Sequence, residues 1–269
     1  MPGRRHGPPR RASLEGASPS GGDSHPAPMQ ICSDLGSVGD FDPDETRELV
    51  ETYFGPIPRG PQPTPILESE ARLDEEIIVR EVEPNGTDHK VWIAWITPEL
   101  YAEGDAELDI ASDLLSNGKD SRLYQRLVQE LQIARSVDAF QFSSRLHGQY
   151  IIEATAASGH TTDELVTEID AILDELRSNG PTEEEVTRAK LTWEVNFYQN
   201  LQTISARANQ LSSYNTVTGN PGFITEDLAR YQQVTTESLH STVETWLPAD
   251  RRVVLHVTPP APEPVSEEN

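Results

Sequence analysis

The sequence predicts an α+β fold, in which a mixed or antiparallel sheet has helices packed on one face. Two pairs of β-rich segments are each joined by turn residues, which is typical of antiparallel hairpins. Runs of helical periodicity follow each pair, whereas a doubly wound fold would alternate single strands with single helices. A last β-rich segment comes after four predicted helices, so the sheet is completed late in the chain.

Composition limits the possible partners. The 269 residues include 21 Lys and Arg against 45 Asp and Glu, a net charge of −24. Nucleic acid and anionic lipid are therefore excluded as main partners, because both would be repelled, and a basic or unfolded peptide is the easier macromolecular guest. Cys32 is the single cysteine, which excludes an intramolecular disulfide and a cysteine-based zinc site. The longest apolar run, Val91–Ile96, is far shorter than the ~20 residues of a membrane span.

The chain is expected to begin without folded structure. Residues 1–30 are rich in Pro, Gly and Arg and carry almost no large apolar side chain, which predicts a disordered segment. A helix is predicted after Asp42, with Pro43 at its first position and Glu45 completing a capping box. The proline-rich run 55–65 that follows predicts a linker. The helix has an apolar stripe of four residues: Leu49, Val50, Tyr53 and Phe54.

Two strands are predicted next, over residues 76–83 and 90–97, with turn residues between them. The second strand shows little alternation, so we expect both of its faces to be covered. Trp92 and Trp95 are then expected in the core, rather than as a platform on which a peptide stacks.

A helical pair and a hairpin follow. Helical periodicity covers residues 105–116 and 120–131, broken by Asn117-Gly118. Residues 133–143 and 149–157 are strand-like and predict a hairpin.

The helices then return. Thr162 is predicted to cap a helix over 163–178, and Thr182 with Glu185 opens one long helix that runs to about Tyr214.

Two shorter helices are predicted over 225–231 and 236–246. A last strand is expected at 251–258, and residues 261–269 form a Pro- and Glu-rich tail.

One stretch resembles a known family. Residues 116–140 (SNGKDSRLYQRLVQELQIARSVDAF) resemble the C-terminal-domain motif of the pitrilysin/insulinase family of zinc metallopeptidases, which includes the mitochondrial processing peptidase and respiratory core subunits. Three further stretches resemble family segments and occur in the family's order: residues 38–58, residues 180–190, and residues 205–214 with 219–221. Together the resemblance spans about residues 38–259.

The resemblance implies a domain plan. Residues 31–66 look like the remnant of a preceding N-terminal-type domain plus a linker, and residues 67–260 look like one complete C-terminal-type domain. It implies the family's two-layer α/β sandwich as the fold.

The family's zinc site is missing from the sequence. Family members bind zinc through a His-x-x-Glu-His helix, where two histidines hold the metal and the glutamate acts as general base. None of the seven histidines begins that pattern: His6, His25, His89, His147, His160, His240 and His256. We therefore assign no catalytic, metal or cofactor residue here, and we expect zinc only in a partner or in a preceding N-terminal domain.

A second family feature is also absent. Many members carry an arginine and, seven residues later, a tyrosine that contact the substrate near the zinc. The corresponding positions are Val128 and Arg135, so that role is not carried over.

Other polar groups are interpreted as structural. Glu183–Glu185 fall at a helix N-terminus, where the dipole favours acidic residues, and Ser121 and Arg122 are interpreted as helix-start architecture. Two His–Glu pairs, each one helical turn apart, supply too few ligands for a metal and are expected to be solvated helix surface: His160 with Glu164, and His240 with Glu244.

The leading hypothesis is a non-catalytic domain, inactive alone, that forms one wall of a peptide-binding chamber. Its partners would be a catalytic zinc-peptidase subunit or lobe and unfolded peptide, held by edge strands of the sheet. One alternative is an assembly subunit without peptide binding. Another is a truncated gene product, because Cys32, Ser33 and Asp34 stand where the family has an apolar run. Relatives are often periplasmic, but no export signal is visible and the compartment stays open.

Overall fold

The computed structural model describes residues 36–58 and 71–260. The predictions for residues 1–30, for the linker beyond residue 58 and for the tail 261–269 lie outside these ranges.

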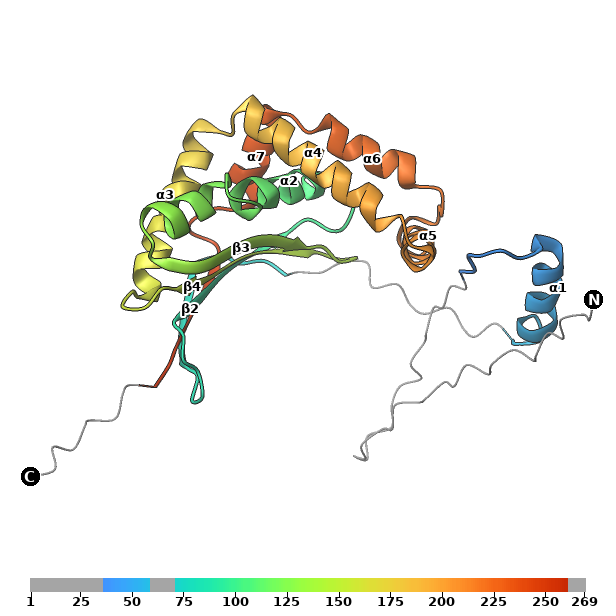
Figure 1. Cartoon of the computed structure of the whole chain (residues 1–269), viewed down its shortest axis with the longest axis horizontal. Coiled ribbons are helices and arrows are strands. Elements are labelled where there is room, and N and C mark those ends of the chain that lie inside the picture. Colours follow the sequence, from blue (N-terminus) through green and yellow to red (C-terminus); the bar gives the residue numbers. More distant parts are fainter. Residues whose placement is uncertain (1–35, 59–70, 261–269) are drawn as a thin grey trace, which may run out of the picture.

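Five strands form a single mixed sheet with the order β1-β5-β2-β4-β3. Neighbouring strands are antiparallel, except that β1 and β5 run parallel. Helices cover one face of the sheet, as Figure 1 shows, and the predicted α+β fold is confirmed. The strands are β1 (Ile77–Val82), β2 (Lys90–Thr97), β3 (Ala134–Phe142), β4 (Gly148–Ala156) and β5 (Val253–Thr258).

The helical layer follows the predicted order. It contains α2 (Asp105–Ser116), a π-helix η1 (Tyr124–Glu130), α3 (Thr162–Asn179), α4 (Glu183–Asn200), α5 (Ile204–Thr218), α6 (Ile224–Gln233) and α7 (Thr236–Trp246). The predicted helix at 120–131 is thus wound mostly as a π-helix, with the N–H of Leu131 bonded to the carbonyl of Arg126.

The core lies between this layer and the covered sheet face. Ile93 and Trp95 of β2 and Ile152 of β4 are fully buried beneath apolar residues of α2 and α3. The indole N–H of Trp95 donates to the Pro248 carbonyl at 2.8 Å, which satisfies the polar atom that burial would otherwise leave unpaired.

The expectation that β2 is covered on both faces was wrong. Its residues alternate between buried and half-buried, because helices pack on only one side of the sheet. Trp95 belongs to the core as expected, whereas Trp92 lies half-buried on the uncovered face.

The single long helix predicted from Thr182 to Tyr214 was also wrong. It is divided into α4 and α5, and the Thr203 side chain caps the second helix by accepting from the Ala206 N–H at 3.2 Å. The cap of α3 shifts by one residue, because Thr161 forms the capping box with Glu164. Thr162 is buried and its hydroxyl bonds to Nδ1 of His256 at 2.8 Å.

The first helix, α1 (Pro43–Phe54), forms where it is predicted and is capped by Asp42, but Glu45 does not complete the predicted capping box. Asp42 Oδ1 accepts from the N–H groups of Asp44 and Glu45 at 2.9 and 3.0 Å. No residue of α1 is buried, and Figure 1 shows the helix apart from the sheet. Its apolar stripe is therefore exposed.

Candidate peptide-binding surfaces

Strand β3 forms one edge of the sheet, and its backbone is partly occupied. The Ser116 hydroxyl at the end of α2 accepts from the Ala139 N–H at 2.8 Å and lies 3.2 Å from the Ala139 carbonyl, to which it can donate. A side chain thus takes the place of a further strand at the middle of this edge. Such blocking is a common way to protect an edge from unwanted pairing.

A groove of about 400 Å³ opens beside this edge, between β3, α2 and α4. Asp109 and Asp113 contribute carboxylates from α2, and Trp193 supplies aromatic surface from α4. Asp138 and Phe140 of β3 border the groove at the strand edge. The groove therefore combines acidic groups with apolar walls, which suits a peptide with basic and apolar side chains.

Burial changes the acidity of the two groove aspartates on α2. Burial raises the pKa of Asp109 from 3.8 to about 7, although the hydrogen bond from Tyr231 acts in the opposite direction. Burial also raises the pKa of Asp113. The negative charge of the groove consequently depends on pH near neutrality.

A polar network beneath the groove joins α2 to α6. The Arg230 guanidinium bridges Asp105 at 2.6 Å and Asp227 at 2.9 Å. The Tyr214 hydroxyl donates to Asp227 at 2.7 Å, and the Gln141 amide donates to Asp105 at 2.7 Å. Because Asp105 and Asp227 are buried and paired, we interpret this network as the support of the groove.

Tyr231 connects the network to the groove wall. Its hydroxyl donates to Asp109 Oδ2 at 2.6 Å, and its ring stacks on Trp193 with centroids 3.4 Å apart. The Trp193 side chain lines the groove on one side and a second hollow on the other.

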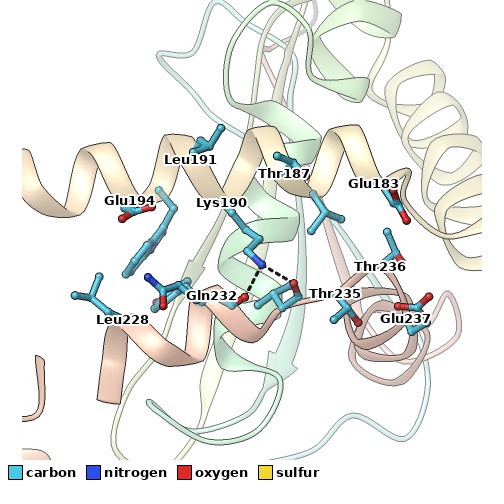
Figure 2. A pocket seen from close by; sticks show the side chains of 14 residues that line it. Glu183, Thr187, Lys190, Leu191, Glu194, Leu228, Gln232, Thr235, Thr236 and Glu237 are labelled. Carbon is cyan, nitrogen blue, oxygen red and sulfur yellow. Dashed lines mark hydrogen bonds between the residues drawn. The ribbon is translucent and has the colours of Figure 1, made fainter. Parts of the chain in front are cut away.

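That second hollow, of about 500 Å³, lies between α4 and the α6–α7 segment. Figure 2 shows Lys190 reaching from α4 to the end of α6, where Nζ donates to the carbonyls of Gln232 at 2.6 Å and Val234 at 2.8 Å. Lys190 thus satisfies carbonyls at the C-terminus of a helix, and we assign it a structural role.

The two His–Glu pairs lie apart from the groove lining. Nδ1 of His160 is 3.5 Å from Glu164, whose carboxylate caps α3. Nε2 of His240 is 2.7 Å from the Arg177 carbonyl and 4.0 Å from Glu244. Within residues 36–58 and 71–260, no three His, Cys, Asp or Glu side chains are grouped so that they could hold a metal ion.

The positions of the family's arginine and tyrosine are used structurally. Val128 packs partly buried against the core, and Arg135 pairs with Asp88 at 2.7 Å. Neither residue lines the groove.

Glu185 and Arg122 form a bidentate ion pair at 2.6 and 2.8 Å. Burial alone would raise the pKa of Glu185, but hydrogen bonds from Arg122 and from the Thr182 backbone lower it to about 2. Glu185 also completes the capping box of α4 with Thr182. The structural interpretation of Glu183–Glu185 and of Arg122 agrees with this geometry.

Comparison with known proteins identifies the family. Residues 33–192, more than half of the chain, match the family described as peptidase M16 inactive domain. The chain therefore belongs to this family. The resemblance to pitrilysin/insulinase-type peptidases is confirmed, and the chain is placed among the non-catalytic domains of the M16 group.

Individual relatives agree. The chain is 24% identical over 182 residues to the zinc protease PqqE of Helicobacter pylori, covering 66% of this chain and 40% of the relative. A protease structure from Helicobacter pylori is 20% identical with a TM-score of 0.74, covering 82% of this chain and 54% of the other. An M16 inactive domain from Pseudomonas fluorescens is 15% identical with a TM-score of 0.71, covering 84% and 53%. The chain thus spans about half or less of these relatives' lengths.

The described residues include no helix long and apolar enough to cross a membrane.

Sequence reasoning missed the groove, although part of its signal was present. Asp105, Asp109 and Asp113 recur at four-residue spacing on a predicted helix that is otherwise largely apolar, which places three carboxylates on one face. Their partners Arg230 and Tyr231 lie more than 115 residues further along the chain, and no local pattern predicts that contact.

Proposed function

We propose that this chain forms one wall of a peptide-binding chamber in an M16-type zinc peptidase, whose zinc is held by another domain or subunit. The supporting observation is the groove beside β3, which places acidic and aromatic side chains next to an exposed strand edge. Both features suit an unfolded peptide segment more than a compact small molecule.

In this proposal the groove recognises side chains more than backbone. Ser116 occupies the Ala139 backbone groups, so an incoming strand cannot pair continuously along β3 without displacing it. A peptide would instead contact Phe140 and Trp193 with apolar side chains. A lysine or arginine of the peptide would approach Asp113 and Asp138, in keeping with the acidic chain.

The catalytic step would belong to a partner. Hydrolysis in this family depends on a metal-bound water, and we assign this chain no metal ligand. Its contribution is to bind and orient the substrate, and the catalytic domain would complete the chamber. The purified chain is accordingly expected to bind peptides without cleaving them.

Fluorescence anisotropy with two labelled peptides of equal length, one rich in Lys and Arg and one rich in Glu, tests this proposal. We expect tighter, salt-sensitive binding of the basic peptide. Replacing Asp113 and Asp138 together by Asn should weaken that binding several-fold, at about 0.2–1 kcal/mol for each charge removed. Asp250→Asn is the control, because it removes one exposed carboxylate that does not line the groove.

Equal affinity for both peptides, or no effect of the double substitution, would contradict the proposal. Stable capture of a catalytic subunit with no peptide affinity would favour the assembly role instead. Metal-dependent cleavage by the purified chain would refute the assignment of catalysis to another domain.

A further inference from the structure

The hollow between α4 and the α6–α7 segment has apolar walls that stay partly open to solvent. Three of its lining residues are buried: Val186, Tyr231 and Val234. Two others are not, because Leu228 is half-buried and Leu191 is 58% exposed. The volume of about 500 Å³ lies within the range of specific binding sites, which is about 300–1,000 Å³. The hollow is therefore large enough to accept apolar side chains of a partner.

Exposed apolar surface continues from the hollow along α4. Val195 and Tyr198 are 53% and 51% exposed, and they follow Leu191 at intervals of four and three residues. This spacing places the three side chains in one stripe that extends about 10 Å along the helix axis. The hollow and this stripe, which we call the helical groove, form an elongated surface. Such a surface favours an elongated occupant over a compact small molecule.

Charge at the helical groove is negative at both ends. Figure 2 shows Glu194 beside Leu228 at one end of the hollow, and Glu183 and Glu237 at the other. Among the described residues that line the hollow, Lys190 is the single cation, and its Nζ already donates to two backbone carbonyls. The lining therefore carries a net charge of −2. An occupant with cationic groups on either side of an apolar segment complements this pattern.

The described and undescribed parts of this chain do not match that chemistry. Helix α1 has apolar side chains but carries four acidic residues against one arginine, so the glutamates of the helical groove would repel it. Residues 1–30 carry arginines but almost no large apolar side chain. A second copy, with a net charge of −24, would also be repelled. These observations favour a different protein as the occupant.

We propose that the helical groove docks a cationic amphipathic helix of another protein. A third helix can pack between the ridges of two neighbouring helices, at the usual interaxial distance of about 8–10 Å. Its apolar face contacts Leu191, Val195 and Leu228, and lysines or arginines on its flanks approach Glu194 and Glu237. The groove beside β3 remains free, because Asp113 and Asp138 do not line this hollow. The inference therefore does not depend on the proposed function.

Fluorescence anisotropy with the full-length chain tests the proposal. The probe is a labelled peptide of about 18 residues, long enough to form a helix, in which leucines recur three and four positions apart among alanines and lysines. The control peptide has the same composition in an order that gives no apolar face. We expect the amphipathic peptide to bind roughly tenfold more tightly, and to keep this advantage at about 0.5 M NaCl, where exposed ion pairs are largely screened. Equal affinities would overturn the proposal, because attraction by net charge alone would explain them.

Substitutions of exposed residues locate the binding. Leu191→Gln combined with Val195→Gln should weaken binding of the amphipathic peptide roughly tenfold. Leu211→Gln on α5 is the matched control, because Leu211 is also exposed but does not line the hollow, and it should leave the affinity unchanged. Glu194→Gln combined with Glu237→Gln should weaken binding at low salt. An unchanged affinity in either double variant would contradict the proposal.

Two further measurements separate this site from the groove beside β3. Replacing Asp113 and Asp138 together by Asn should leave binding of the amphipathic peptide unchanged. Hydrogen exchange in the wild-type chain should slow in α4 and α6 when the peptide is added, without a change in β3. Protection confined to β3, or a loss of affinity only in the Asp113 and Asp138 variant, would overturn the proposal and assign the peptide to the groove beside β3.

Discussion

Asp109 offers the most specific test of the groove, because its environment opposes its charge. The carboxylate lines the groove on α2, accepts from the Tyr231 hydroxyl at 2.6 Å and lies near the charge of Asp105. Burial is the main reason that its pKa rises from 3.8 to about 7. The folded protein therefore holds the Asp109 proton more tightly than the unfolded chain does.

Proton linkage gives the direction in which the stability changes with pH. Between pH 4 and 7 the folded state binds more protons at Asp109 than the unfolded state, so the free energy of unfolding falls as pH rises. The stabilisation that comes from protonated Asp109 is fully present below about pH 4 and is lost as pH rises through about 7. A change from 3.8 to about 7 corresponds to an upper limit of about 4 kcal/mol.

Asp109→Asn removes the cost of ionising a buried carboxylate, and it keeps a carbonyl oxygen that can accept a hydrogen bond from the Tyr231 hydroxyl. We expect the variant to be more stable than the wild type by about 2–4 kcal/mol at pH 8 and by only about 1 kcal/mol at pH 4.5. Urea unfolding at both pH values measures the difference, and the exposed Asp250→Asn serves as control. A variant less stable than the wild type at pH 8, or an offset independent of pH, would refute the reasoning.

Three further predictions concern structural contacts. Glu185→Gln should destabilise the fold by about 2 kcal/mol at pH 7, as measured by urea unfolding. This loss of stability should shrink as pH falls from about 4.5 to 2, because the pKa of Glu185 in the folded protein is about 2. Lys190→Met should cost about 1–2 kcal/mol by leaving the α6 carbonyls without their donor, and an unchanged unfolding midpoint would contradict this. Ser116→Ala should speed hydrogen exchange at the Ala139 amide without unfolding the sheet, and unchanged protection would show that Ser116 does not cover the edge.

Local pattern was enough to predict most of the elements. Strand β2, helix α2 and helix α7 have the predicted bounds, because an apolar run or helical periodicity stops there at residues that break or cap the element. The division between α4 and α5 was missed because helical sequence continues through it. Thr203 was the available signal, since a threonine before a new turn of helix is a favourable N-cap.

The burial of β2 could not be predicted from β2 alone. Its sequence is apolar at almost every position, and only the placement of the helices decides which side is covered. The same limit applies to Trp92 and Trp95, which differ by three positions and therefore point to opposite faces. Tertiary packing, not strand propensity, makes Trp95 part of the core and leaves Trp92 on the uncovered face of the sheet.

The Asp109 pKa also has a consequence for binding. A cationic side chain in the groove favours the ionised carboxylate, so peptide binding should release a proton near neutral pH. By linkage, the affinity for a histidine-free basic peptide should rise as pH increases through about 7. Anisotropy at pH 5.5 and 8 measures this, and Asp109→Asn should flatten the dependence while the Asp250→Asn control keeps it. If the wild type and Asp109→Asn show the same pH dependence, the basic side chain of the peptide does not reach Asp109, and recognition must rest on Asp113, Asp138 and the aromatic walls.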